Sequence, residues 1–413
     1  MLFNSADYLI FLVLMFFGFW ALRRFRAWRV LFLILGSCFF YMSWNRYLIL
    51  LILYSTLIDW WTGNAIARTS APRKRKFYLL VSLVTNLGLL FVFKYANFFF
   101  DAFNQLAQWL ELPLHAPTLQ LLLPVGISFY TFQTLSYTID IYRGQLEPAR
   151  NLREFFLYVI FFPQLVAGPI VRAVDFVPQL DRTPVPNVRE GIDGLYRIAI
   201  GLVKKVAFAD YLALNVVERV FERPELFSSL ECLVAVYAYA FQIYFDFSAY
   251  SDIAIGSAKM LGYHMPENFN APYTARNLQE FWHRWHMTLS TWLRDYLYIP
   301  LGGSRHGAWK TYRNLFLTML LGGLWHGASW TFVVWGAMHG VGLALTRMYQ
   351  RGRENTTPNR WLEPFGVFFT FHYVCLAWIF FRAPSFEVAA SMLQQIAGLS
   401  MDCLLYTSDA ADE

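Results

Sequence analysis

Residues 3–22 read FNSADYLIFLVLMFFGFWAL and lead directly into the basic sequence RRFRAWR of residues 23–29. A stretch of about 20 mostly apolar residues is the length that a helix needs to cross the hydrocarbon core of a bilayer. No basic segment precedes this run and no small-residue cleavage site follows it, so we expect a retained helix and not a secretory signal. The sequence therefore predicts a chain that lies in a lipid bilayer.

The composition of all 413 residues agrees with a membrane environment. The chain is 57% hydrophobic, 19% aromatic and only 15% charged, whereas soluble domains average about 45–50% apolar and about 25% charged residues. These proportions exclude disordered, collagen-like and coiled-coil chains and disulfide scaffolds. The net charge of +6 comes from basic clusters between apolar runs, which favours membrane orientation over nucleic-acid binding. The four cysteines have no metal-binding spacing.

Further apolar runs are expected to cross or enter the membrane. They cover residues 30–43, 46–66, 77–100, 119–141, 193–220, 229–262, 312–326, 329–348, 364–382 and, more briefly, 387–399. The run 119–141 contains the helix-breaking residues Pro124 and Gly126. The positive-inside rule places the basic clusters at 23–29 and 73–76 in the cytoplasm, and hence the N-terminus on the periplasmic side. The sequence predicts an all-α polytopic membrane protein with about 10–11 spans, joined by short interfacial and re-entrant helices.

Two segments depart from the pattern of a simple span. Residues 151–180 contain Pro163, Gly168 and Pro169, and such irregular backbone survives at membrane depth only when it is buried in protein or lines a wet cavity. We expect a broken or re-entrant segment there. Residues 272–300 are aromatic but carry seven charged or histidine side chains, which is too polar for contact with lipid.

No soluble domain or internal repeat is visible, so we expect a single integral-membrane domain over residues 1–402. The sequence from 403 to 413, CLLYTSDAADE, resembles the translation of a sequencing-library adapter. We expect this tail to be artefactual and the natural chain to continue in its place, and we exclude it from the fold.

Ionisable and polar side chains inside apolar segments are candidates for functional residues. The first group lies within one predicted helix and comprises Asp246, Ser248, Tyr250, Ser251 and Asp252. Asp246 and Asp252 are six residues apart and so lie on different sides of that helix, which argues against a paired-carboxylate site. These side chains either line a cavity or bind neighbouring helices.

The second group contains His283 and His286, with Glu280 three residues before His283. Glu-x-x-His is half of a di-iron signature, and the second copy that this chemistry requires is missing. We expect His283 to lie at headgroup depth. His286 is expected to face inward with Trp285, as a structural or a functional residue.

The third group is centred on His326, which lies between the small residues Gly322, Gly323, Gly327 and Ala328. Small residues allow helix backbones to approach closely, or leave room for a long substrate. A histidine among apolar residues is disfavoured in its charged form, so it is available as a proton acceptor. His339 is a packing residue or supports His326. We predict no metal site, because carboxylates are not at ligand spacing from His283, His286 and His326.

Three strings in this order, YFDFSAYSDIAIG (244–256), FNAPYTARNLQEFWHRWHMTLSTWLRDYLYIPLGG (269–303) and GGLWHGASWTFVVWGAMHG (322–340), resemble the membrane-bound O-acyltransferase (MBOAT) family. The resemblance is to its bacterial polysaccharide branch and extends from the N-terminus to about residue 400. It implies a multi-helix bundle around a transmembrane tunnel. Two positions depart from the family pattern: His283 stands where Arg is usual, and Ala249 stands where Gly is common.

The resemblance implies that His326 and His286 are the catalytic histidines, and that Trp285 and Trp325 line the tunnel together with the first group. It implies transfer of an acetyl group from a cytoplasmic thioester, most simply acetyl-CoA as substrate, for O-acetylation of an exported, alginate-like polysaccharide. No bound cofactor is expected. The expected partners are the donor, a periplasmic acetyltransferase, the polysaccharide and membrane lipid, in the bacterial inner membrane.

Other functions are compatible with parts of this sequence pattern. Relatives that transfer D-alanine to teichoic acid, or acetyl groups to peptidoglycan, share much of the pattern. From other classes, a proton-coupled transporter of acyl groups or sugars would use the histidines as a relay. A scaffold that recruits periplasmic transferases would not need them for chemistry.

Overall fold

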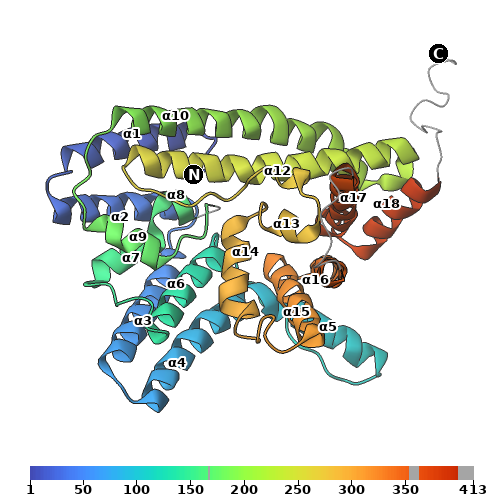
Figure 1. Ribbon diagram of the computed structural model, residues 1–413, viewed down its shortest axis with the longest axis horizontal. Coiled ribbons are helices and arrows are strands. Elements are labelled where there is room, and N and C mark those ends of the chain that lie inside the picture. The colour runs from blue at the N-terminus through green and yellow to red at the C-terminus, as the bar shows by residue number, and fades with distance from the viewer. Residues whose placement is uncertain (166–167, 353–361, 399–413) are drawn as a thin grey trace. The chain divides into compact units, whose positions relative to one another are not determined.

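The computed structural model describes residues 1–165, 168–352 and 362–398. Within these ranges the regular structure is helical and contains no strand, which confirms the predicted all-α class (Figure 1). The chain divides into two compact units. The first consists of Met1–Gly201 and Tyr250–Glu267, and the second of Leu202–Ala249 and the described residues from Asn268 onward.

The first unit contains the N-terminal helices and several short ones. They are α1 (Ala6–Ala21), α2 (Arg26–Met42), α3 (Ile49–Arg68), α4 (Pro72–Leu90), the π-helical stretch Phe91–Tyr95, α5 (Ala96–Trp109), α6 (Ile127–Tyr142), α7 (Leu152–Ile160), α8 (Phe162–Leu165), α9 (Ala173–Leu180) and most of α10 (Val188–Val203). The last turns of α12 (Ser229–Met260) also belong to this unit.

The second unit holds the first part of α12 and the motif-bearing segments. Its other elements are the π-helical stretches Lys204–Asp210, Ala213–Val217 and Arg294–Tyr298, the 3-10 turns Pro224–Leu226 and Pro272–Thr274, α11 (Glu218–Glu222), α13 (Leu278–Trp282), α14 (Met287–Leu293), α15 (Ala308–His326), α16 (Trp330–Arg351), α17 (Glu363–Arg382) and α18 (Phe386–Gly398).

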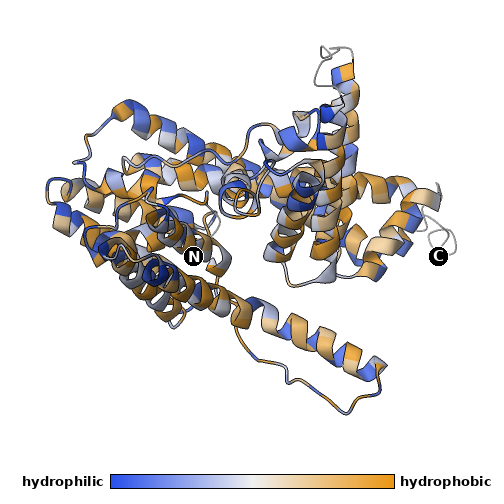
Figure 2. Ribbon diagram, turned by 60° about the horizontal axis from the view of Figure 1, so that its bottom comes forward, coloured by the Kyte–Doolittle hydropathy of each residue, from blue (hydrophilic) through white to orange (hydrophobic). Residues whose placement is uncertain are grey.

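Four helical stretches among the described residues are long and apolar enough to cross a membrane. They are Ile49–Arg68, Pro72–Trp109, Ser229–Met260 and Glu363–Arg382. The shorter α1 is also apolar, and it exposes Ile10, Leu14 and Phe17 on one side. Figure 2 shows hydrophobic residues, coloured orange, along most of the helices. Apolar side chains that no protein covers are expected where lipid is the solvent. The chain is thus polytopic, and the count of ten or eleven spans stays a prediction.

A buried polar cluster joins three helices of the first unit. Asp59 of α3 is fully buried and accepts hydrogen bonds from Ser82 Oγ (2.5 Å) and Asn86 Nδ2 (2.9 Å) of α4 and from Thr138 Oγ1 (3.3 Å) of α6. A buried carboxylate is tolerated only when hydrogen bonds replace its hydration. These donors therefore fix the mutual register of α3, α4 and α6.

Three expectations about segments can be compared directly with the structure. The predicted run 119–141 is helical only from Ile127, because Pro124 and the left-handed Gly126 (φ 75°) prevent a helix from starting earlier. The predicted break within 151–180 is confirmed, since this stretch forms the short helices α7, α8 and α9. Residues 272–300 likewise form short helical pieces and no span.

The expected tail from 403 to 413 lies outside the described residues. The expectation of one domain over residues 1–402 stays a prediction, and the two compact units describe only how contacts group within the chain.

Candidate active site

His326 lies at the tip of a tight helical hairpin. It is the last residue of α15, and after Gly327 and Ala328 the side chain of Ser329 accepts a hydrogen bond from the Thr331 N–H and caps α16. Glycines let the two helices pack closely. A Cβ on Gly323 would lie 2.8 Å from the Cα of Gly336. Of the two roles considered for the small residues, close backbone approach therefore applies at Gly323.

Three aromatic rings surround the half-buried imidazole of His326. Its ring centroid lies 4.9 Å from that of Trp325, 5.0 Å from Trp335 and 5.3 Å from Phe381, each in an edge-on arrangement. Trp335 comes from α16 and Phe381 from α17, so three different helices form this environment. The imidazole is held by ring packing on several sides and is not fully covered.

His286 reaches the same region from the break between α13 and α14. Its side chain is 1% exposed, and its backbone has φ 42° and ψ 56°. A residue with a Cβ pays roughly 1–3 kcal/mol in such a left-handed conformation, and residues of this kind concentrate at functional sites. The strained backbone turns the chain sharply between two short helices and aims His286 inward, as expected, whereas His283 is exposed.

Asn268 determines the tautomer of His286. Asn268 Oδ1 accepts hydrogen bonds from the Thr288 backbone N–H (3.3 Å) and hydroxyl (3.0 Å) and lies 3.0 Å from His286 Nδ1. The backbone donor identifies this atom as the amide oxygen, so Nδ1 of His286 must be the protonated nitrogen. The lone pair of the neutral ring is therefore on Nε2.

His286 and His326 are coupled through a shared tryptophan. Trp325 lies against His326 and also has its ring centroid 6.5 Å from that of His286. Burial, with the nearby charge of His326 added, holds the pKa of the His286 imidazole well below its usual range. His286 is thus a neutral side chain, suited to hydrogen bonding or proton acceptance.

His339 lies behind this pair in a fully buried position on α16. It accepts a hydrogen bond at Nδ1 from the Trp282 indole N–H (3.3 Å), and its ring is 4.8 Å from Trp335. An indole nitrogen can only donate, so the neutral ring of His339 carries its proton on Nε2. His339 was expected either to pack or to support His326. This geometry fits a packing residue that contacts Trp335, which in turn contacts His326.

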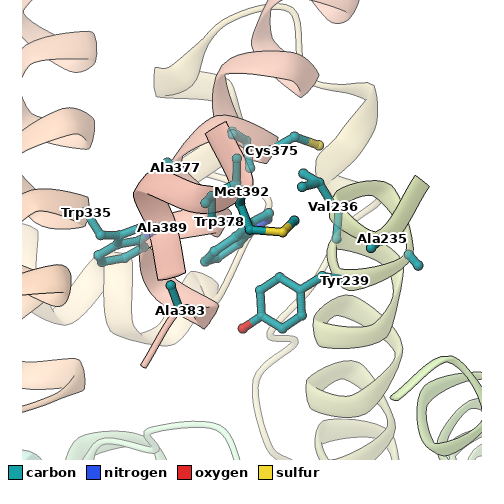
Figure 3. Packing of buried hydrophobic residues seen from close by; sticks show 14 of the residues in the cluster. Ala235, Val236, Tyr239, Trp335, Cys375, Ala377, Trp378, Ala383, Ala389 and Met392 are labelled. Atoms are coloured by element: carbon teal, nitrogen blue, oxygen red, sulfur yellow. The ribbon is translucent and has the colours of Figure 1, made fainter. Parts of the chain in front are cut away.

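A large apolar cluster includes Trp335, one of the rings that contact His326. Trp335 stacks on Trp378 of α17 with ring centroids 5.9 Å apart and an interplanar angle of 17°. Figure 3 shows these two tryptophans with residues from α12 and α18, among them Tyr239 and Met392. Close-packed aromatic cores permit little side-chain movement. The cluster therefore fixes the ring that contacts His326.

The acidic candidates are all engaged in ion pairs. Asp246 pairs with Lys205 (2.7 Å) in the second unit, and Asp252 pairs with Arg197 (2.9 Å) in the first. They do not form a carboxylate pair, as their spacing predicts. Glu280 is held by Arg276 and Arg284, which explains the Glu-x-x-His spacing without a metal. No group of three or more metal-ligating side chains occurs among the described residues.

The predicted tunnel-lining residues fall in both units. Trp285 (3% exposed), Trp325 and Ser248 are buried in the second unit. Tyr250, Ser251 and Asp252 lie on the following turns of α12, which belong to the first unit. A role for these six residues and for Asp246 in a tunnel stays a prediction.

Sequence reasoning did not single out Asn268, Trp335 and Phe381, which hold the two histidines. Trp335 lies inside the motif that contains His326, so its place in this motif is a sequence signal that could have identified it. Asn268 is 18 residues before His286, and Phe381 is on a separate helix. No local periodicity connects either of them to the histidine that it contacts.

Comparison with known proteins identifies the family of this chain. Residues 149–384 match the model of the membrane-bound O-acyltransferase family. The chain belongs to the MBOAT family. The matched range contains α12, the His286 segment and the α15–α16 hairpin. The resemblance stated from the three sequence strings is confirmed, and the chain is a membrane O-acyltransferase.

Individual MBOAT relatives differ in the polymer that their names specify. The chain is 42% identical to the probable alginate O-acetylase AlgI of Pseudomonas aeruginosa, over 95% of this chain and 74% of the relative. It is 37% identical to the peptidoglycan O-acetyltransferase of Helicobacter pylori, over 100% of this chain and 83% of that relative. It is 28% identical to the teichoic acid D-alanyltransferase of Bacillus subtilis, over 66% of this chain and 72% of that relative.

Proposed function

We propose that this enzyme transfers an acetyl group from a thioester donor to a hydroxyl acceptor, with His326 as the general base, and so serves the O-acetylation of an exported, alginate-like polysaccharide. The observation that supports the role of His326 is its position. It is half-buried at the tip of the α15–α16 hairpin, held by three aromatic rings and adjacent to a second, buried histidine.

In the proposed step, His326 takes the proton of the acceptor hydroxyl as the oxygen attacks the thioester carbonyl. The new C–O ester bond forms, the C–S bond breaks, and the proton passes from His326 to the departing thiolate. General-base catalysis contributes about 10²–10⁴-fold to such a reaction. Orientation of donor and acceptor beside the same imidazole supplies a further part of the rate.

His286 is assigned a supporting role in this proposal. Its Nδ1–H is held by Asn268, so Nε2 can accept a hydrogen bond from a second donor group of the acceptor, such as a neighbouring sugar hydroxyl, and so orient the hydroxyl that His326 deprotonates. The backbone of His286 is in the left-handed conformation, which costs free energy. Because residues in such conformations concentrate at functional sites, this supports a functional role for His286. Asp246, Ser248, Tyr250, Ser251 and Asp252, with Trp285 and Trp325, are assigned to the passage for substrates.

The donor, partner and orientation are parts of the same proposal. Acetyl-CoA is the simplest donor substrate, entering from the cytoplasm. The acceptor is a hydroxyl on a periplasmic acetyltransferase that then modifies the polymer, or a lipid carrier. The basic clusters at 23–29 and 73–76 favour an inner-membrane protein with a periplasmic N-terminus.

Peptidoglycan is the second candidate polymer. It is favoured by the relative from Helicobacter pylori, whose name specifies that polymer and which matches the full chain. Both polymers present sugar hydroxyls, so the chemistry at His326 is the same for either acceptor.

The polymer and the role of His326 can be tested in cells that depend on this protein. We expect His326→Ala to abolish acetylation of the polymer while the protein level stays normal, and exposed His306→Ala to leave acetylation unchanged. Ester-linked acetate is released by mild base from purified exopolysaccharide and, separately, from peptidoglycan. Normal acetylation in the His326→Ala strain would contradict the proposal, and the fraction that loses acetate identifies the polymer.

A further inference from the structure

The helical stretch Pro72–Trp109 in the first unit is longer than a bilayer is thick. Its 38 residues would reach about 57 Å as a straight helix, whereas the hydrocarbon core measures about 30 Å. The stretch is interrupted by the π-helical turn Phe91–Tyr95, and Tyr95 has φ −113°, far from the helical value of about −63°. Figure 1 shows α4 and α5 pointing in different directions on the two sides of this turn.

The bend falls where a membrane span would end. The basic cluster at 73–76 marks one face of the membrane. The apolar residues 77–95 that follow it rise about 28 Å as a helix, which matches the thickness of the hydrocarbon core. α5 therefore starts at the opposite face of the membrane, and the chain changes direction there.

α5 carries two exposed stripes of opposite character. The apolar stripe recurs at spacings of three or four residues and consists of Phe99, Phe103, Leu106 and Leu110. The polar stripe recurs in the same way and consists of Asp101, Gln105 and Gln108. At 3.6 residues per turn the two stripes lie on opposite sides of the helix. A helix of this pattern lies in the plane of a membrane surface, with its apolar side toward the acyl chains.

Residues 111–125, the strap, follow α5 and are tied along it by two asparagine side chains. Asn104 Oδ1 accepts a hydrogen bond from the Ala116 N–H (2.7 Å), and its Nδ2 donates to the carbonyl of the same residue (3.1 Å). Asn97 makes the same pair of bonds with Leu119 (2.8 and 2.9 Å). The strap adds five exposed leucines to the apolar surface, namely Leu112, Leu114, Leu121, Leu122 and Leu123.

The strap limits the depth at which this surface can lie. Its described residues form no helix, and they include Pro113, Pro117 and Pro124. Irregular backbone that is exposed to lipid does not occur within the hydrocarbon core, because its polar groups need water there. Exposed leucines, in turn, are unfavourable in water. The headgroup boundary satisfies both conditions, since acyl chains and water are both within reach. Trp109, which is 79% exposed, is of the residue type enriched at this depth.

The charge of the region indicates which kind of lipid surface it fits. Between residues 95 and 142 the sequence contains no Lys or Arg and three acids, Asp101, Glu111 and Asp140. Interfacial helices that bind anionic lipid carry basic residues on their polar face. α5 presents Asp101 on that face, so its attraction to the membrane is apolar and not electrostatic.

We infer that α5 and the strap form an interfacial anchor in the leaflet opposite the 73–76 cluster. The stripe of Phe99 and Phe103 lies among the acyl chains at the headgroup boundary, and the stripe of Asp101 and Gln105 faces water. The partner of this surface is a bilayer with zwitterionic headgroups. The anchor is independent of the chemistry at His326, and on the predicted topology it lies on the periplasmic side.

The test attaches an environment-sensitive fluorophore to single cysteines of the full chain, in phosphatidylcholine nanodiscs that hold one copy each. The other cysteines are replaced. Phe103→Cys reports on the apolar stripe, Leu122→Cys on the strap, and Gln105→Cys is the matched control on the polar stripe. Lipids with a nitroxide near the headgroup or near the end of the acyl chain serve as quenchers. We expect emission from Phe103→Cys and Leu122→Cys to shift to shorter wavelength and to be quenched mainly by the shallow nitroxide, while Gln105→Cys emits as in water.

Each other outcome contradicts the inference. Water-like emission at Phe103→Cys or Leu122→Cys, or quenching mainly by the deep nitroxide, would overturn it. A shift to shorter wavelength without quenching by either lipid would show that protein covers the stripe, and would overturn it as well. Added phosphatidylglycerol or high salt should leave the Phe103→Cys emission unchanged. A shift that requires anionic lipid or low salt would contradict the apolar attraction.

Discussion

His286 and His326 show how two identical side chains acquire different capacities. His286 is completely buried, and Asn268 holds its proton on Nδ1. His326 is half-buried, and aromatic rings position it on several sides. A group that must meet a substrate has to be accessible, whereas a buried group can orient it. The proposed division between base and positioning residue follows from this difference.

Removal of the Asn268 acceptor should impair His286 without removing either histidine. In Asn268→Leu, Nδ1–H loses its acceptor, so the ring is free to change tautomer and orientation. We expect the acetyl-transfer rate to fall about 10- to 100-fold, equivalent to a loss of roughly 1.5–3 kcal/mol. The rate is measured with purified, folded protein and a saturating donor.

Thr288→Val provides the matched control for that experiment. It deletes a hydroxyl donor to the same Asn268 oxygen but leaves the contact with His286 in place. We expect less than a threefold change in rate. An Asn268→Leu enzyme as fast as Thr288→Val would show that the tautomer of His286 has no part in the reaction.

At this scale the sequence predicts the histidines but not what holds them. The motifs single out His326 and His286, and the inward orientation of His286 is confirmed by its burial. The left-handed backbone of His286 is not predictable from residue type, since only a few per cent of non-glycine residues adopt it. It is maintained by the chain around it, where the Met287 N–H donates to the Asn268 carbonyl (2.9 Å).

At the scale of elements, the α15–α16 hairpin sets the position of His326. Gly323, Gly336 and Gly340 allow the two helices to approach so closely that side chains are replaced by backbone contact. Helices in membranes gain most of their association from such close packing, because lipid tails are as apolar as the side chains. The position of His326 therefore depends on glycines that never touch it.

Gly323→Ala should separate these helices and displace His326. A Cβ there would lie 2.4 Å from the Phe332 carbonyl oxygen, so backbone has to move. We expect a loss of stability of about 1–3 kcal/mol and a lower transfer rate. Thermal unfolding in detergent and the rate measurement check both effects.

Gly88→Ala in α4 is the control for helix propensity. Nothing lies within 4 Å of a Cβ at that position, and Ala in place of Gly within a helix contributes about 0.5–1 kcal/mol of stability. Equal changes in thermal stability and transfer rate for Gly323→Ala and Gly88→Ala would contradict the role of close packing at Gly323.

The sequence predicts most elements and the residues that interrupt them. Apolar length locates α12, α16 and α17, and the prolines and glycine predict the broken segment 151–180. Within the apolar run 119–141, Pro124 and Gly126 are expected to break a helix, and the structure confirms the break. The helix starts at Ile127, directly after these two residues.

At the scale of the whole molecule, charge and hydropathy are separated along the chain. One basic cluster follows α1 and another forms the first turns of α4. Acids inside apolar segments are neutralised by partners, as Asp246 is by Lys205. This separation predicts membrane topology, and it was evident from the sequence. The number of spans is harder to predict, because several helices are too short or too polar to be counted by hydropathy.

The predicted topology can be tested with single cysteines in a variant in which the other cysteines of the chain are replaced. Both test positions are exposed in the structure: Arg46→Cys between α2 and α3, and Lys74→Cys at the start of α4. We expect a membrane-impermeant maleimide to label Arg46→Cys in intact spheroplasts, and Lys74→Cys only after lysis. The reverse pattern would place the N-terminus and the basic clusters on the opposite sides.

Acetyl transfer that depends on His326 is tested most directly by thiol release from acetyl-CoA. The purified full chain in nanodiscs is mixed with acetyl-CoA and a hydroxyl acceptor, and free CoA thiol is followed with time. We expect His326→Ala to lower the acceptor-dependent rate by about 10²–10⁴-fold, with exposed His306→Ala unchanged. Thiol release at the wild-type rate from folded His326→Ala protein would contradict the assignment of His326 as the base.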